Sequence, residues 1–209
     1  MTVPVPRRVL VPIVEGVGEA SAVPELLQRW LAALGRSHAC AIEHPVRAPG
    51  ASALKHPHDA ARELGIEHFV RAALRRGPAA ILVLLDADRE CVTRASGHAE
   101  ALGPELLRRA KAVAAHVEVA VVVADPEYEA WFLRHAPRVF PGLADEPLET
   151  PRDCKKAVER VLRRPYKETI DQRLLTRRLP TPTAEELDLI VDRSYGKLCR
   201  EVLRLLGAD

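Results

Sequence analysis

The stretch Ala80–Asp88, AILVLLDAD, decides the fold of this chain. Its first six residues, Ala80–Leu85, are all apolar and run directly into Asp86 and Asp88. Such a strand has no polar face for water, and this is typical of a parallel sheet covered by helices on both sides. The stretch therefore predicts an α/β protein with acidic residues at the end of a buried strand.

Two other apolar segments have the same form as Ala80–Leu85. Val9–Val14 ends at Glu15, and Val117–Ala124 ends at Asp125. The alternation of these strands with helical patterns predicts a mainly parallel, Rossmann-like sheet sandwiched by helices over residues 1–136. The intervening predictions are a helix at Val23–Leu34, a weak strand at His38–Val46, a loop to Ala53, a helix at Asp59–Arg76 with Asp59 as its N-cap, and a helix at Glu100–Ala115.

The rest of the chain has a different pattern. Residues 137–151 are rich in proline and predict an irregular linker. Residues 152–209 predict a helical C-terminal extension. The predicted helices of this extension lie at Arg152–Arg163, Glu185–Asp192 and Tyr195–Leu206.

Composition excludes several classes of protein. The net charge of +2 is too small to indicate nucleic-acid binding by itself. The four cysteines are far apart and form no CxxC pair, which argues against a zinc site and a disulfide-framed secreted fold. The first residues do not resemble a signal peptide, and no apolar run reaches ~18 residues. We therefore expect a cytoplasmic protein without a membrane span, and a homodimer is left open.

Acidic residues follow each of the three apolar strands. Because the carboxyl ends of parallel strands meet at one edge of a sheet, we expect Glu15, Asp86 and Asp88 to converge there. Glu19, four residues after Glu15, would share its side of a helical turn. Carboxylate oxygens suit Mg²⁺, Mn²⁺ or Ca²⁺. The pattern predicts a divalent metal site, although acids that merely follow strands on the surface are the simpler alternative.

Five segments resemble a known family. VLVPIVEGVGEASAVPELL at residues 9–27 is similar to the opening of a Toprim domain, and AILVLLDADRE at residues 80–90 resembles its DxD motif. The other three resemble small bacterial Toprim-like proteins of unassigned function, which are related to OLD-type nucleases. These three are DPEYEAWFL at 125–133, YKETIDQRLL at 166–175 and DRSYGKLCREVLRLLG at 192–207.

The resemblance implies roles for the acidic residues. Asp86 and Asp88 would bind Mg²⁺ or Mn²⁺, and Glu15 would be the catalytic carboxylate. Glu19 would assist both metal binding and catalysis, as in OLD-type nucleases. A later acidic ligand would be Glu129, with Glu127 as the alternative; this match is looser. No tyrosine is placed as in a topoisomerase, so strand passage is not expected.

Several lysines and aromatic residues are further candidates. Lys55 would offset charge on a phosphate during catalysis, although a solvated lysine is the simpler interpretation. The same alternative applies to the predicted nucleic-acid-binding residues, Lys155, Lys156 and Lys167. We expect His56 and His58 to lie in a loop, and Trp30 and Trp131 to belong to the core.

These expectations combine into one leading hypothesis. The chain would be a Mg²⁺-dependent Toprim-like phosphodiesterase, a DNA-binding nuclease that works with a partner ATPase of the SMC or ABC type in phage defence or DNA repair. The partner follows from the resemblance alone. The rivals are a non-catalytic Toprim-like subunit that senses or binds a partner, and a phosphotransfer enzyme for a small substrate. No P-loop, and no third glycine of a dinucleotide-binding motif, is present.

Overall fold

The computed structural model describes residues 8–87, 98–190 and 192–207. Its centre is a five-stranded sheet made of β1 (Arg8–Val14), β2 (Cys40–Ile42), β3 (Val46–Arg47), β4 (Ala80–Asp86) and β5 (Glu118–Ala124). The strand order is β2-β1-β4-β5, and β3 pairs with the second half of β1. Every pairing among these strands is parallel, which confirms the predicted α/β class with a parallel sheet.

The register of the sheet aligns the ends of its strands. Val14, the last residue of β1, pairs with Leu84, and Asp86, the last residue of β4, pairs with Ala124. Glu15 is therefore placed beside the end of β4. A single edge of the sheet collects the residues that follow β1, β4 and β5.

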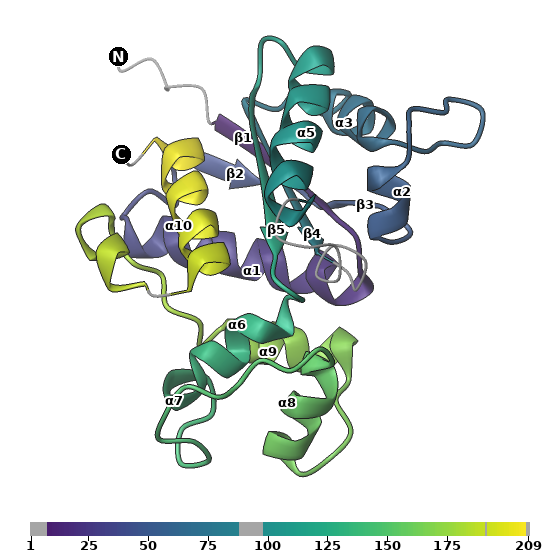
Figure 1. Ribbon diagram of the computed structural model, residues 1–209. Helices are drawn as coiled ribbons and strands as arrows, with labels where there is room; N and C mark the ends of the chain where they lie inside the picture. The colour runs from purple at the N-terminus through teal and green to yellow at the C-terminus, as the bar shows by residue number, and fades with distance from the viewer. Residues whose placement is uncertain (1–7, 88–97, 191, 208–209) are drawn as a thin grey trace, which may run out of the picture.

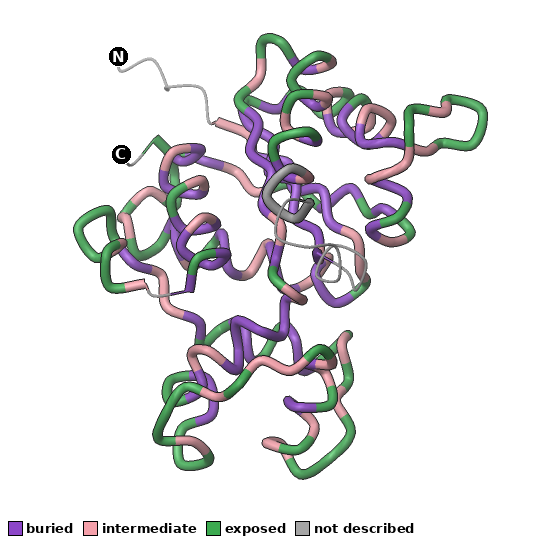
Figure 2. Tube along the Cα trace, viewed as in Figure 1, coloured by how far each residue is buried: buried purple, intermediate pink, exposed green. Residues whose placement is uncertain are grey.

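Helices cover both faces of the sheet (Figure 1). α1 (Val17–Ala33) and α10 (Arg193–Leu206) pack on one face, and α3 (Ile66–Leu74) and α5 (His98–Val113) pack on the other. Leu82 and Leu84 belong to the first hydrophobic cluster, whereas Ile81 and Val83 belong to the second. Alternate residues of β4 thus enter different cores, and the central strands are buried along most of their length (Figure 2).

The segments after β5 form a helical lobe below the carboxyl edge of the sheet (Figure 1). Its elements are α6 (Glu129–Arg134), α7 (Ala136–Val139), α8 (Cys154–Leu162), the π-helix η1 (Glu168–Gln172) and α9 (Arg173–Thr176). The 3₁₀-helix η2 (Ala184–Leu189) leads to α10. Residues of α6, α8, α9 and α10 share one hydrophobic cluster with β1, β4 and β5. The division at residues 136 and 151 stays a prediction.

The two tryptophans lie in this shared core, as predicted. Trp30 and Trp131 are fully buried. Trp30 donates to the carbonyl of Pro182, and Trp131 donates to the hydroxyl of Ser194. Both indole N–H groups are thus satisfied, so these rings hold the C-terminal segments onto the sheet.

Local structure differs from prediction at residues 51–76. The helix predicted from Asp59 begins only at Ile66, because the Asp59 carboxylate accepts from the backbone N–H groups of Ala61 and Arg62 and closes a turn. Gly65, with φ of 91°, then redirects the chain into α3. The predicted loop up to Ala53 contains the start of a short helix, α2 (Ala51–Lys55).

Three smaller differences follow the same local rules. The predicted strand at His38–Val46 is split into β2 and β3, which pair with successive parts of β1. The segment at Glu185–Asp192 forms the 3₁₀-helix η2 with a capping box at Thr183, and α7 extends into the predicted linker.

Cys40, Cys154 and Cys199, the described cysteines, are buried and form no disulfide. No helix in residues 8–87, 98–190 or 192–207 is long and apolar enough to cross a membrane.

Candidate functional site

Four acidic side chains gather at the carboxyl edge of the sheet. They come from the end of β1, the first turn of α1, the end of β4 and the start of α6. The charges of the other three act on Asp86 and raise its pKa well above the ordinary range, although burial is the largest cause. These four residues, which we call the edge cluster, are Glu15, Glu19, Asp86 and Glu129.

Glu15 and Asp86 are in direct contact. Glu15 Oε1 accepts a hydrogen bond from the backbone N–H of Asp86 at 3.2 Å. Asp86 Oδ1 accepts from the backbone N–H of Tyr128 at 2.9 Å. The strand ends and the entry to α6 are therefore joined through the two carboxylates, and the parallel register explains why residues 71 positions apart meet.

Glu19 is held from the opposite side by the π-helix. Its Oε1 atom accepts from the side-chain amide of Gln172 at 2.7 Å, and the residue is 7% exposed. The glycines of EGVGE provide the space for this contact. A Cβ atom on Gly16 would lie 1.8 Å from Glu19 Oε2, and one on Gly18 would lie 1.6 Å from Gln172 Oε1. With Glu19 and Gln172 in these positions there is no room for a Cβ atom at either glycine, so a larger residue would displace the carboxylate or the amide.

Glu129 is the most deeply buried acid of the cluster. It has no exposed surface, and its Oε1 atom accepts from the Tyr166 hydroxyl at 2.9 Å. Its Oε2 atom is buried and has no hydrogen-bond partner among the described residues. Burial raises the pKa of Glu129 to about 7, the charge of Lys155 opposes this rise, and the charge of Glu19 adds to it. A buried carboxylate oxygen without a donor is costly.

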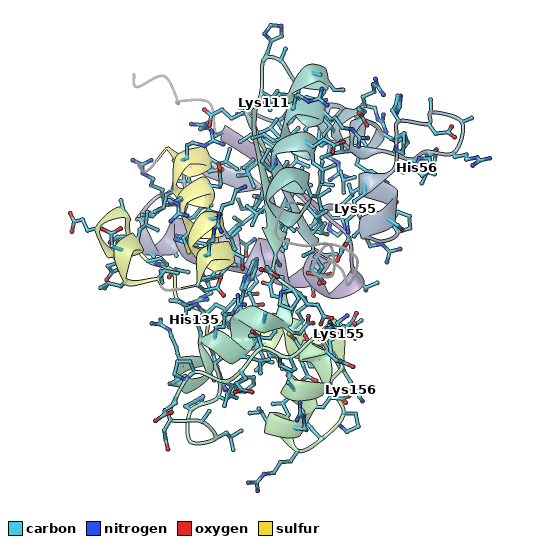
Figure 3. The ribbon with its side chains drawn as sticks, viewed as in Figure 1. Lys55, His56, Lys111, His135, Lys155 and Lys156 are labelled. Atoms are coloured by element: carbon cyan, nitrogen blue, oxygen red, sulfur yellow. The ribbon has the colours of Figure 1, made fainter. Side chains whose placement is uncertain are left out.

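Two lysines lie near the edge cluster, Lys55 on α2 and Lys155 on α8, and both are labelled in Figure 3. Lys55, at the end of α2, donates to the carbonyl of Ala87 at 3.2 Å, directly after β4. Lys155, in the first turn of α8, pairs with Glu168. Burial opposes the charge on Lys155, but the hydrogen bond to Glu168 and the charges of Glu129 and Asp86 outweigh it, so its pKa is raised. Lys155 therefore acts on the acids and is not simply a solvated residue.

The other predicted residues lie apart from the cluster or outside the described structure. Asp88 is outside the described residues. Lys156 is exposed and pairs with Asp153 within α8, and Lys167 is exposed beside η1. Glu127, the alternative to Glu129, lies two residues before the start of α6, and its role as a ligand stays a prediction.

The chemistry of the edge cluster fits a hard divalent cation, since all its ligand atoms would be carboxylate oxygens. In their present positions, however, no three Asp, Glu, His or Cys side chains of the described residues are spaced to hold one metal ion. The donor types thus agree with the predicted site, whereas a complete ligand set is not formed by residues 8–87, 98–190 and 192–207.

The sequence analysis did not predict the residues that hold the acids in place by hydrogen bonds. Tyr166 and Gln172 hold Glu129 and Glu19, and Tyr128 supplies the backbone donor to Asp86. The signal that could have found two of them is YKETIDQ, a polar segment inside an otherwise helical tail. It contains the π-helix η1, and such helices frequently occur at functional sites.

The comparisons with known proteins place the chain in a family. Residues 14–186 match the family described as a domain of unknown function (DUF4276), and the chain belongs to that family. The match spans every residue of the edge cluster together with Tyr166 and Gln172. Curated proteins gave no match. Solved structures gave none either. The Toprim resemblance stays a prediction.

Proposed function

We propose that this protein is a Mg²⁺- or Mn²⁺-dependent, Toprim-like phosphodiesterase that cleaves nucleic acid. The observation that carries the proposal is the buried edge cluster. Glu19 and Glu129 are held by an amide and a phenol instead of a cation, and Glu129 keeps a buried oxygen without a donor. Gathered carboxylates repel one another unless a cation neutralises them, so a bound metal is the simplest explanation.

In this proposal each acid has a separate role. Asp86 and Asp88 would hold the metal, and Glu19 and Glu129 would complete its surroundings. A bound divalent ion polarises the phosphate and makes water a better nucleophile. Glu15 accepts the proton that the attacking water loses as its oxygen bonds to phosphorus. The P–O bond to the leaving group breaks, and the leaving oxygen takes a proton from solvent.

The residues around the acids support this chemistry. Gln172 and Tyr166 orient Glu19 and Glu129 through hydrogen bonds of 2.7 and 2.9 Å. Lys55 lies at the end of β4 and offsets negative charge on the phosphate. Lys155 balances part of the acidic charge from the lobe side. The partner ATPase of the SMC or ABC type, and a role in phage defence or DNA repair, rest on the resemblance to OLD-type nucleases alone.

A cleavage assay tests the proposal. The parent protein is incubated with plasmid, linear duplex, single-stranded DNA and RNA in Mg²⁺, Mn²⁺ or EDTA. We expect cleavage that needs the metal and disappears in Asp88→Asn and Glu15→Gln. Asp145→Asn is the matched control, because Asp145 is an exposed loop acid that lies in neither the edge cluster nor the basic clefts. Full activity in both site variants would overturn the assignment.

One observation favours a second candidate, a non-catalytic subunit that binds a partner through the same edge. Among the described residues, no three acids are spaced for one metal ion. This candidate predicts metal binding without cleavage of any substrate. Titration of the parent protein with Mn²⁺, run beside the cleavage assay, separates the two functions.

A further inference from the structure

A cleft of about 390 Å³ lies beside the edge cluster, between α5, α10 and the ends of β4 and β5. Ala87 and Asp125 line it from the sheet edge, and Gly103 lines it from α5. The wall contributed by α10 is basic and contains Arg193, Lys197 and Arg200. None of these three residues was singled out from the sequence.

The basic wall is fixed by the fold. Its three residues are spaced by four and three positions, so they share one face of the α10 helix. The opposite face contains Leu198, Val202 and Leu205, which are buried in the hydrophobic cluster that includes β4 and β5. The cleft therefore keeps its positive side because α10 cannot turn without exposing its apolar face.

Two of these cations have no ion-pair partner among the described residues, namely Lys197 and Arg200. Several other basic side chains are paired, such as Arg109 with Glu67, Arg164 with Asp171, and Arg177 with Glu25. Among the described residues, Asp125 is the only acid that lines the cleft. Lys197 and Arg200 thus face a single carboxylate of the described residues, and this imbalance favours an anionic ligand.

The cleft and the edge cluster are joined by consecutive residues of the chain. Ala87, which lines it, directly follows Asp86, and its N–H donates to the carbonyl of Ala124. Ser194 is also rigid, since its hydroxyl accepts from Trp131 and donates to Asp192. A chain of phosphates that extends from the edge cluster toward α10 would enter this cleft.

We propose that the α10 cleft binds the sugar–phosphate backbone of a nucleic acid next to the position that the edge cluster attacks. Its place beside a cleaved phosphate rests on the proposed function, whereas the binding itself does not. Arg and Lys side chains supply most phosphate contacts in proteins that hold nucleic acid. The cleft, and not the predicted Lys155, Lys156 and Lys167, is then the main anchor for the strand.

Another basic cleft among the described residues is a weaker candidate and serves as the control. It lies on α8 and contains Lys156, Arg160 and Arg164 together with Asp153 and Glu159. Lys156 pairs with Asp153, and Arg164 pairs with Asp171. Two of its three basic side chains therefore form ion pairs with acids of the same chain.

Fluorescence anisotropy in EDTA tests the inference without cleavage. The probes are a fluorescein-labelled 20-nucleotide single strand and its duplex. We expect the double variant Lys197→Ala/Arg200→Ala to bind about tenfold more weakly at physiological salt, and its plot of log K against log[salt] to be shallower by about 1.5–2. The control Lys156→Ala/Arg160→Ala should bind within about twofold of the parent.

The outcomes separate this inference from the proposed function. Equal affinity of parent and α10 variant, or an equal loss in the α8 control, would overturn the cleft as anchor. Binding that depends on α10 in a protein that cleaves nothing would sustain the anchor and reject the nuclease. Unchanged circular dichroism and melting temperature in both double variants show that the readout is binding and not folding.

Discussion

Acidic side chains lie in two different surroundings in this molecule. Between α3 and α5, Glu67 receives two hydrogen bonds of 2.8 Å from Arg109, and these lower its pKa. At the carboxyl edge of the sheet, Asp86 and Glu129 lie among other acids, and burial together with neighbouring negative charge raises the pKa of each. Glu67 forms a close ion pair with Arg109 in one region, whereas in the other the described residues form no ion pair with Asp86 or Glu129.

The ion pair of Glu67 with Arg109 shows that a largely buried acid of this chain can have an arginine partner of its own. Arg109 also donates to the carbonyls of Lys55 and His56, so one arginine ties α5 to the end of α2. At the edge, neutral donors take that place, and one buried oxygen of Glu129 receives nothing from the described residues. Clustered carboxylates of this kind repel one another, and this is the property on which the proposed metal site rests.

The largest expected effect is on thermal stability in the presence of metal. At a Mg²⁺ concentration of 100 times the Kd, binding adds about 2.7 kcal/mol to folding. For a domain of this size the melting temperature should rise by roughly 5–10 °C. Asp86→Asn should remove this rise, and Asp125→Asn should keep it. Differential scanning fluorimetry with Mg²⁺ and Mn²⁺ measures the shift, and an equal rise in Asp86→Asn would place the metal elsewhere.

The second effect compares one chemical change in both surroundings. Glu67→Gln removes the charge that Arg109 needs and should cost about 1–2 kcal/mol. Asp86→Asn in EDTA should cost nothing or stabilise, because it removes one of several clustered charges and keeps the acceptor for the Tyr128 N–H. Urea unfolding of both variants in EDTA gives the comparison. A similar loss in the two would mean that the edge cluster is as well paired as Glu67.

The third effect concerns the close contact between Gly18 and Gln172, whose side-chain amide donates to Glu19. Gly18→Ala places a Cβ atom 1.6 Å from Gln172 Oε1 and must displace that side chain. The strain of overpacking exceeds the gain in helix propensity, so we expect a net loss of about 1 kcal/mol. Gly103→Ala in α5 meets nothing nearer than 3.6 Å and should be neutral or slightly stabilising. Urea unfolding distinguishes them, and equal stability of the two variants would contradict the crowding at Gly18.

Much of this arrangement could be predicted from local pattern. The apolar runs that end at Glu15 and Asp86 define buried parallel strands, and parallel strands bring their carboxyl ends together. Glu19 follows from its spacing within the first turn of α1. Asp59 was interpreted wrongly because its side-chain oxygen accepts backbone N–H groups in a turn as readily as at a helix N-terminus.

The residues that hold the acids in place by hydrogen bonds could not be predicted from the sequence. Gln172 reaches Glu19 across 153 positions, and Tyr166 reaches Glu129 across 37. These contacts depend on how the helical lobe folds back under the sheet. The spacing of apolar residues within a single helix or strand does not predict that arrangement. The charge of Lys155 interacts with Glu129 and Asp86, which its place on a predicted helix did not indicate, and its contact with nucleic acid stays a prediction.

The smallest expected effect is the pH dependence of a paired acid next to the site. Asp171 precedes Gln172 on the π-helix and receives two hydrogen bonds from Arg164, at 2.6 and 2.7 Å. These bonds are the largest cause of its lowered pKa, and the backbone N–H of Lys167 adds to them. Because the folded pKa lies below the unfolded value of about 4, the contribution of Asp171 to stability is fully present above that pH. It is lost as the pH falls through the folded pKa.

Asp171→Asn should therefore lower the urea midpoint at pH 7, and its difference from the parent should shrink as the pH falls below about 4. The effect is small since the Arg164 side chain is half exposed to water. Asp145→Asn, at an exposed loop acid, is the matched control and should leave the midpoint unchanged at both pH values. A difference for Asp171→Asn that stays constant from pH 7 to pH 3 would show that its role is packing of the π-helix. The contrast between paired acids and the edge cluster would then rest on Glu67 alone.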